Sequence, residues 1–216
     1  MKDSKKSTAI LFDFDGVILD SFDKAFGFKS GHCPHLTDDV YRGLFRGNIN
    51  DGDRSLVHTE ACTRIGNYFD AYRPHFESTV FFEGIEDFIR RVGVRHNLFI
   101  VSSCTNELIN WSLEKHGVSD EFVEIFGNDV HESKVEKTNS ILKRFNFSPE
   151  QTVFVTDTVG DIREAREAGV EVIAVSWGFH SADWLREAKP LHLVHSVAEL
   201  EAALEDTFNA HAASGH

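Results

Sequence analysis

The sequence predicts an α/β fold, a doubly wound parallel sheet with a small α-helical cap inserted after the first strand. From residue 84 onward, short apolar runs alternate with amphipathic stretches, which is typical of strands connected by helices. Right-handed crossovers of this kind produce a parallel sheet with helices on both faces. Residues 20–83 lack a convincing strand pattern, so we expect them to form the helical insertion.

The first strand is expected over residues 8–13, where an apolar run leads directly into Asp13. Within the insertion, Thr37 precedes two acidic residues and marks a helix start. A longer helix is expected from about Gly52 to Tyr72, with Pro74 ending it.

The remaining elements alternate regularly, and Gly117 and Gly169 end two of the helices. Strands are expected at 97–102, 122–126, 152–156, 170–175 and 191–194, and helices at 84–93, 106–116, 134–145, 160–168, 182–188 and 197–207. We therefore expect an α/β core of residues 1–19 and 84–208, a cap of residues 20–83, and a flexible tail of residues 209–216.

The composition argues against several classes of protein. With 22 Lys and Arg against 35 Asp and Glu, the net charge is −13, which disfavours nucleic acid as a partner. No apolar run approaches the ~20 residues of a membrane-spanning helix, and the apolar run behind the basic N-terminus is too short for a secretory signal. Cys33, Cys62 and Cys104 cannot all pair, which favours a reducing compartment, and we expect a cytoplasmic protein.

Polar and charged residues follow the predicted strands at the points where the strands end. In a parallel sheet these points lie on one edge, so residues distant in the sequence are expected to converge there. The members of this group are Asp13 and Asp15 after the first strand, Ser102 at the end of the second, Lys134 at the start of the helix after the third, and Asp157 and Asp161 after the fourth.

This set of side chains has the composition of a phosphoryl-transfer site. Several carboxylates form an oxygen-rich site suited to Mg²⁺. One carboxylate can attack phosphorus to form an aspartyl-phosphate, and a second, when protonated, can donate to the leaving oxygen and later accept a proton from water. Lys134 and Ser102 would neutralise and hydrogen-bond the phosphoryl group, and backbone N–H groups of the following helix would add affinity for it.

The chain resembles the haloacid dehalogenase superfamily of aspartate-nucleophile phosphatases from Leu11 to about Leu204. The motifs that carry the resemblance are DFDGVILDS at 13–21, IVSS at 100–103, Lys134, and VTDTVGDIREAREAG at 155–169. The subgroup it is most similar to comprises the phosphoglycolate phosphatases and β-phosphoglucomutases, which carry a helical cap on a Rossmann-like core.

The resemblance implies a role for each matching residue. It implies that Asp13 is the nucleophile and Asp15 the general acid and base, and that Ser102, Ser103 and Lys134 hold the phosphate. It also implies that Mg²⁺ is bound by Asp13, the backbone carbonyl of Asp15, and Asp157, with direct or water-mediated support from Asp161. The implied activity is Mg²⁺-dependent hydrolysis of a small phosphorylated metabolite, by a monomer or a homodimer.

Two positions depart from the pattern of that subgroup. Thr156 stands where glycine is usual, and Val135 stands where proline is usual. Neither change removes a functional group, but Thr156 adds bulk beside the expected metal site.

Some alternative functions stay open, and others are disfavoured by Asp15. A phosphomutase would use the same nucleophile with a sugar hydroxyl as acceptor, and the sequence does not separate it from a phosphatase. Relatives that cleave phosphonates or carbon–halogen bonds lack the second aspartate, so Asp15 argues against both. A signalling receiver or a non-catalytic phosphate-binding module is the alternative from another class.

Polar residues of the predicted cap are candidates for contacts with the substrate's leaving group. They are Arg42, Arg46, Asn48 and Arg54. The segment from Gly31 to His35 contains two His and one Cys, but it lacks a second ligand pair at a known metal-binding spacing.

Overall fold

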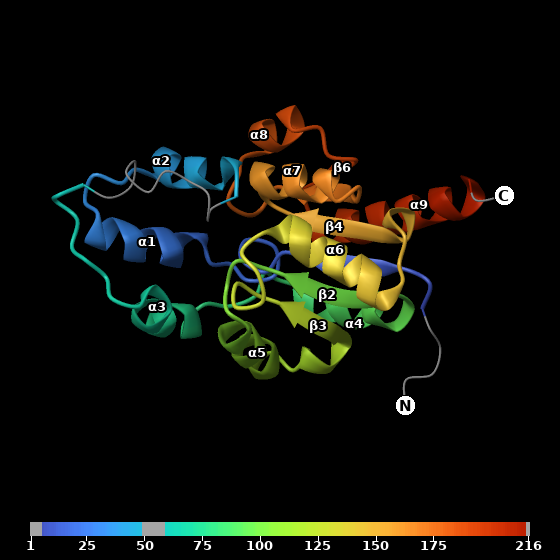
Figure 1. Ribbon diagram of the computed structural model, residues 1–216, viewed down its shortest axis with the longest axis horizontal. Coiled ribbons are helices and arrows are strands. Elements are labelled where there is room, and N and C mark those ends of the chain that lie inside the picture. Colours follow the sequence, from blue (N-terminus) through green and yellow to red (C-terminus); the bar gives the residue numbers. More distant parts are fainter. Residues whose placement is uncertain (1–5, 49–58, 215–216) are drawn as a thin grey trace.

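The computed structural model describes residues 6–48 and 59–214. Its centre is a six-stranded parallel sheet in the order β3-β2-β1-β4-β5-β6, which is the predicted doubly wound arrangement. Figure 1 shows the strands ending on the side of the molecule opposite to the two termini. The strands are β1 (Ala9–Phe12), β2 (Asn97–Val101), β3 (Phe122–Phe126), β4 (Thr152–Thr156), β5 (Glu171–Val175) and β6 (His192–Val194).

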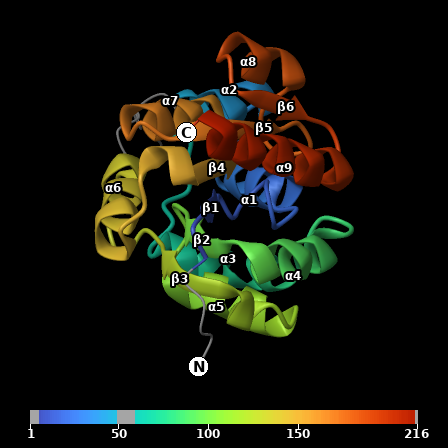
Figure 2. The same ribbon diagram turned by 90° about the vertical axis from the view of Figure 1, so that its right-hand side faces the viewer.

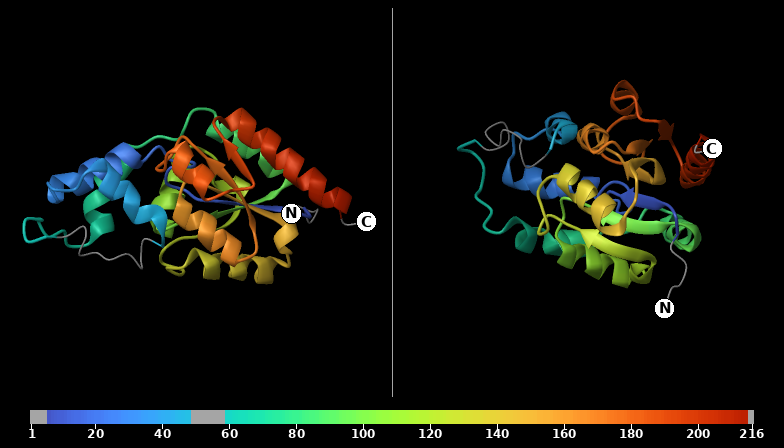
Figure 3. Two further views of the ribbon diagram at one scale, coloured as in Figure 1. Left: turned by 90° about the horizontal axis from the view of Figure 1, so that it is seen from above. Right: turned by 45° about the vertical axis from the view of Figure 1, so that its right-hand side comes forward.

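Alternating side chains of the buried strands fill two separate hydrophobic cores. In β1, Ile10 and Phe12 join the core on one face, and Ala9 and Leu11 join the core on the other. The first core is covered by α4 (Ile85–Arg95), α5 (Asn106–Lys115) and α9 (Val197–Ser214), and the second by α6 (Lys134–Phe145), α7 (Val159–Glu167) and α8 (Ala182–Glu187). Figures 2 and 3 show the two helical layers on opposite sides of the sheet.

Strand β1 lies at the point where the order of the strands reverses. It pairs with β2 on one side and with β4 on the other, with Phe12 opposite Ile100 and Val155. Ligand sites of open parallel sheets lie beyond the carboxyl ends of the strands at such a point. The loops after β1, β2 and β4 are therefore brought together at this edge of the sheet.

Helices of residues 22–77 lie over the carboxyl edge of the sheet, as Figure 1 shows. They are α1 (Phe22–His32), α2 (Asp38–Gly43), the 3₁₀ turn η1 (Leu44–Arg46) and α3 (Tyr68–Glu77). Aromatic rings hold them together: Phe28 of α1 packs against Tyr68 and Tyr72 of α3, with ring centroids 5.7 and 5.4 Å apart. Such contacts contribute about 0.5–1.5 kcal/mol each beyond the apolar area they bury.

The two chain segments that lead into and out of these helices lie side by side. Asp20 N–H donates to the carbonyl of Val80 at 2.9 Å, and Phe82 N–H donates to the carbonyl of Ile18 at 3.0 Å. Leu19 and Phe81 form an antiparallel bridge between them. We refer to this pair of segments, residues 18–20 and 80–82, as the connecting ribbon.

The core elements match the sequence prediction closely, and the insertion matches it less well. The strands at 122–126 and 152–156 and the helix at 134–145 have the predicted bounds. Helix α1 was not predicted, because Gly27 and Gly31 and its evenly spread phenylalanines weaken the amphipathic pattern.

The prediction of a helix from Gly52 to Tyr72 that ends at Pro74 is correct for residues 68–72 but wrong for residues 59–67 and for the end of the helix. Residues 52–58 lie outside the described residues, and residues 59–67 are not helical. Helix α3 begins at Tyr68, capped by the Asn67 side chain, and continues past Pro74 to Glu77. The buried contacts of Tyr72 and Phe76 offset the hydrogen bond that the proline lacks.

The prediction of a frayed tail from Asn209 is also wrong for the described residues, because α9 continues to Ser214. Ion pairs fix the helix to α4, with Arg91 to Glu201 at 2.8 Å and Arg95 to Glu205 at 2.7 Å. Two further short 3₁₀ turns among the described residues are η3 (Ser119–Glu121) and η4 (Pro149–Gln151). Within residues 6–48 and 59–214, no helix combines the length and apolar character needed to cross a bilayer.

His96, at the start of β2, gives folding stability a specific dependence on pH. Its ring stacks on Phe208 of α9 at 4.7 Å and contacts the Thr8 hydroxyl at 2.7 Å. Burial, reinforced by Arg95 and Lys6, lowers the pKa of His96 from 6.5 to about 4. Between these two values the unfolded chain binds more protons than the folded chain.

We therefore predict that His96 contributes a loss of unfolding free energy as the pH falls from 6.5 to 4, and no change above 6.5. In His96→Gln, which has no titrating ring, the slope of unfolding free energy against pH should be shallower in that window. Urea unfolding at several pH values measures both slopes. Equal slopes for the variant and the unmodified chain would contradict the assignment.

Candidate active site

Strand β1 delivers Asp13 to the carboxyl edge of the sheet. Its backbone N–H continues the pairing with β4 by donating to the carbonyl of Val155 at 2.9 Å. Its side chain is 5% exposed, and its Oδ1 accepts the N–H of Phe14 at 2.7 Å. Gly16 then turns the chain with φ of +78°, and a Cβ on it would lie 2.0 Å from Asp157 Oδ2, so a residue with a side chain does not fit there.

Lys134 lies between two buried carboxylates. Its Nζ is 2.8 Å from Asp13 Oδ2 and 2.7 Å from Asp161 Oδ2. Lys134 is the first residue of α6, whose N-terminus is capped by the Ser133 hydroxyl. Although burial lowers the pKa of the Lys134 ammonium, the two carboxylates raise it further, and the group stays charged.

Thr156, the departure from the family pattern, holds Asp161 in place. Its hydroxyl donates to Asp161 Oδ2 at 2.7 Å and accepts the N–H of Thr158 at 3.2 Å. Burial raises the pKa of Asp161, but the charge of Lys134 and the hydrogen bonds from Asp13, Lys134 and Thr156 outweigh it and lower the pKa below its ordinary value. The extra bulk at position 156 therefore comes with a specific contact at the site.

Asp157 is fully buried and has one oxygen without a hydrogen bond. Its Oδ2 accepts the N–H of Phe179 at 2.6 Å, whereas Oδ1 has no partner among the described residues. Burial raises the pKa of Asp157 to about 7, although the Phe179 N–H opposes this. Leaving a buried acceptor unpaired costs about 1–3 kcal/mol, so this oxygen is suited to a ligand.

Asp15 differs from the other acids because it is only half-buried. Burial nevertheless raises the pKa of its carboxyl group, opposed by the Ser21 hydroxyl and by Lys134. The phenol groups of Tyr41 and Tyr72, from the inserted helices, interact electrostatically with Asp15. Asp15 thus lies within electrostatic range of the inserted helices, whereas Asp13 and Asp161 contact Lys134 of α6 directly.

The set of donors fits Mg²⁺ in its chemistry. Asp13, Asp15, Asp157 and Asp161 supply only oxygen ligands, which Mg²⁺ prefers, and Asp157 Oδ1 is an unpaired buried acceptor. The fit concerns the ligand atoms and not yet their arrangement, because within the part of the chain that the structure describes no three His, Cys, Asp or Glu residues are positioned to hold a metal ion. The Lys134 ammonium provides the positive charge beside Asp13 and Asp161 in this arrangement.

Strand β2 brings Ser102 to the same edge. Ser102 is fully buried, and its Oγ accepts the N–H of Cys104 at 3.0 Å, which shapes the turn into α5. Ser103, the next residue, is half-buried. Helix α6 stabilises this turn, because Lys137 Nζ donates a hydrogen bond to the Ser102 carbonyl at 2.6 Å.

Lys137 and His180 are site residues that the sequence interpretation missed. Lys137 is 1% exposed, and burial and the nearby Lys134 lower its pKa to about 8. Its position three residues after Lys134, on the same face of α6, was the available signal. His180 accepts the Val159 N–H at 2.9 Å and contacts the Arg42 carbonyl at 2.9 Å, and no sequence motif pointed to it.

The predicted substrate residues of the insertion contact the core in this structure. Arg42 lies over the Phe22 ring, pairs with Asp38 and donates to the Phe179 carbonyl. Arg46 lies over the Trp184 ring at 3.7 Å, and Asn48 donates to Glu164 at 3.1 Å. Their contact with a substrate stays a prediction, and Arg54 lies outside the described residues.

Comparisons with known proteins agree with the geometry. The sequence profile described as haloacid dehalogenase-like hydrolase matches residues 10–175. The phosphoglycolate phosphatase of Synechococcus elongatus is 24% identical over 89% of this chain and 98% of its own length. Pyrophosphatase PpaX of Oceanobacillus iheyensis is 24% identical over 92% of this chain and 97% of its own length.

A solved structure has the same fold. A haloacid dehalogenase-like family hydrolase from Streptococcus pneumoniae superimposes with a TM-score of 0.68 at 21% sequence identity. The match covers 93% of this chain and all of that one. Because the coverage is nearly complete, the similarity includes the inserted helices as well as the sheet.

We predict that Thr156→Val lowers the unfolding free energy by about 1–2 kcal/mol, because it removes a hydrogen bond to a buried charged group. Thr138→Val is the matched control, since the Thr138 hydroxyl is equally buried but has no partner among the described residues. Urea unfolding of the two variants measures the difference. If both variants lose the same stability, the Thr156 contact does not hold Asp161.

Proposed function

Because the chain belongs to the haloacid dehalogenase-like hydrolases, whose profile covers most of it, we propose that it is a Mg²⁺-dependent phosphatase that hydrolyses a small phosphorylated metabolite. The observation that carries the proposal is the contact of buried Asp13 with Lys134, beside the half-buried Asp15. The phosphoglycolate phosphatase and pyrophosphatase among the relatives support a phosphate ester or anhydride as substrate.

In the proposed mechanism the Asp13 carboxylate attacks phosphorus and forms an aspartyl-phosphate. The Phe14 N–H holds Oδ1 and Lys134 Nζ holds Oδ2, so both oxygens of the Asp13 carboxylate have fixed positions. Lys134, already beside Asp13, offsets the negative charge of the phosphoryl oxygens. Ser102, Ser103 and the N–H groups at the start of α5 would hold the remaining oxygens.

Asp15 acts as general acid and then as general base. The raised pKa of its carboxyl group favours the protonated form, which can donate to the leaving oxygen. In the second half of the reaction the resulting carboxylate takes a proton from the water that hydrolyses the aspartyl-phosphate. The electrostatic interaction of Asp15 with Tyr41 and Tyr72 and its half-buried side chain support a proton transfer that is partly shielded from bulk solvent.

Mg²⁺ would be held by Asp13, the backbone carbonyl of Asp15 and Asp157, with Asp161 in support. When bound, it supplies positive charge that brings the anionic phosphoryl group next to an acidic site. Thr156 and Lys134 orient Asp161, and the Phe179 N–H orients Asp157. These contacts restrict both carboxylates before a cation arrives.

Residues 20–83 form the proposed cap, which excludes water and selects the substrate. Both of its connections to the core run through the connecting ribbon, so the ribbon is the proposed hinge. We also propose a cytoplasmic protein, because an odd number of cysteines cannot all pair, and one that acts as a monomer or a homodimer.

We predict that Asp13→Asn lowers the turnover of an aryl phosphate by about 1,000-fold or more, because an amide is not a nucleophile. Phosphate released from the aryl ester and from a panel of phosphorylated metabolites is the measurement. Asp23→Asn, an exposed acid of α1, is the control and should retain activity. Robust turnover by Asp13→Asn would refute the mechanism, and interconversion of sugar phosphates without phosphate release would identify a mutase.

We predict that Asp157→Asn raises the Mg²⁺ concentration needed for half-maximal activity by about 10–100-fold, because it removes a charged ligand and keeps the shape of the side chain. Removal of the ion with a chelator should abolish activity in the unmodified protein, and added Mg²⁺ should restore it. An unchanged Mg²⁺ requirement in the variant would exclude Asp157 from the metal site.

A further inference from the structure

Two cysteines that are distant in the sequence lie in contact within the inserted helices. Cys33 caps the C-terminus of α1, and Cys62 belongs to the segment of residues 59–67 that leads to α3. The Thr63 N–H donates to the His32 carbonyl at 2.8 Å, which sets the two backbones side by side. Cys33 belongs to the hydrophobic core, Cys62 packs against that core, and each thiol shifts the pKa of the other. Adjacent backbones with side chains in contact are the geometric requirement for a disulfide.

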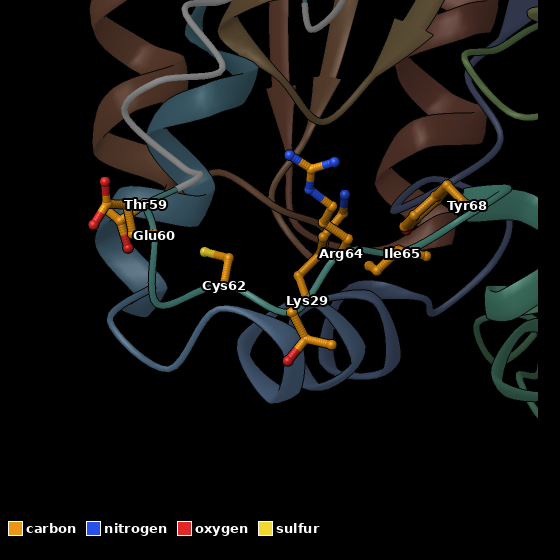
Figure 4. Close-up of a pocket in the computed structure, with 8 residues that line it drawn as sticks. Lys29, Thr59, Glu60, Cys62, Arg64, Ile65 and Tyr68 are labelled. Carbon is orange, nitrogen blue, oxygen red and sulfur yellow. The ribbon is translucent and has the colours of Figure 1, made fainter.

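The two sulfur atoms have different environments. Cys33 is 1% exposed and packs in the main core, whereas Cys62 is partly exposed. Figure 4 shows Cys62 among the residues that line a cavity of about 740 Å³, with Lys29 and Arg64 nearby on the same wall. An oxidant in solution can therefore reach Cys62 first, and Cys33 only through Cys62.

The pKa values of the two thiols also indicate that Cys62 reacts before Cys33. Burial raises the pKa of Cys62, but hydrogen bonds from Cys33 and from Thr59 outweigh it and lower the pKa below its ordinary value. Burial and the hydrogen bond to Cys62 raise the pKa of Cys33 to about 11. Because the thiolate is the reactive form, Cys62 is the better nucleophile of the pair.

A metal ion explains this cluster less well than thiol chemistry does. His35 Nδ1 lies 3.9 Å from Cys62 Sγ, so one nitrogen and two sulfur atoms gather here. A structural zinc site needs four ligands.

We propose that Cys33 and Cys62 are a thiol–disulfide exchange site, in which Cys62 attacks a low-molecular-weight disulfide and Cys33 resolves the product. The Cys62 thiolate bonds to one sulfur of glutathione disulfide and expels the other as glutathione thiolate. Cys33 then gives up its proton, attacks the Cys62 sulfur and expels the second glutathione. Two protein thiols are oxidised, one glutathione disulfide is reduced, and the two thiol protons end on two glutathione molecules.

The resulting disulfide would tie α1 to the wall of the cavity. It closes a loop over residues 34–61, which restricts the unfolded chain and fixes the segment that carries Thr63 and Arg64. Thiol chemistry at this site is independent of the proposed phosphatase activity, because neither cysteine belongs to the acidic site at the sheet edge.

The experiment oxidises the reduced full-length chain with glutathione disulfide, alkylates the remaining thiols and maps the peptides by mass spectrometry. We expect the number of free thiols to fall from three to one, with Cys104 left alkylated. We also expect a mass loss of about 2 Da, a linked Cys33–Cys62 peptide, and reversal by dithiothreitol. The thermal midpoint should rise by about 5–10 °C on oxidation.

Three serine variants separate the roles. Cys104→Ser should behave like the unmodified chain, and Cys62→Ser should leave Cys33 reduced. Cys33→Ser should stop at a glutathione adduct on Cys62, about 305 Da heavier, because no resolving thiol is present. A lasting glutathione adduct on Cys62 of the unmodified chain, a bridge that involves Cys104, or failure to oxidise in glutathione disulfide alone would overturn the proposal.

Discussion

The contact of Lys134 with Asp13 and Asp161 is the interaction on which the arrangement of the acidic site depends. Burying several carboxylates at one edge of a sheet is unfavourable, because desolvation and mutual repulsion both oppose their ionisation. One ammonium group at 2.7–2.8 Å from two of them offsets part of this cost and leaves Asp157 with an unpaired oxygen. The core therefore maintains a site that is still short of positive charge, and this deficit favours the binding of a cation.

The inserted helices complete this environment by docking on both sides of the acidic site. On one side, His180 links the start of α7 to the Arg42 carbonyl, and Phe179 packs against rings of α1 and η1. On the other side, Arg73 of α3 pairs with Glu107 of α5 at 2.6 Å. Asp15, which interacts electrostatically with Tyr41 and Tyr72 of these helices, is half-buried, whereas Asp13 is buried. These contacts hold the inserted helices against the core.

How well each element and each site residue could be predicted depends on whether the sequence carries a local pattern for it. Strands such as β4 and helices such as α6 have strong periodic patterns and clear capping residues, so their bounds could be predicted. The convergence of Asp13, Lys134 and Asp157 follows from the topology of a parallel sheet. In contrast, α1 and α3 depend on aromatic contacts between distant residues, and Pro74 is tolerated only because of that packing. The contacts of Thr156 and His180 with their partners likewise require tertiary structure, and no local pattern encodes them.

The connecting ribbon has a consequence for how such proteins diversify. Because the chain leaves the core at Asp20 and returns at Val80, two residues joined by a hydrogen bond, the core is closed before the intervening segment begins. Loop-closure entropy grows only slowly with length, so that segment can be lengthened, shortened or exchanged at little cost to the sheet. Selection can thus act on molecular recognition as a separate module, while the chemical machinery is inherited unchanged.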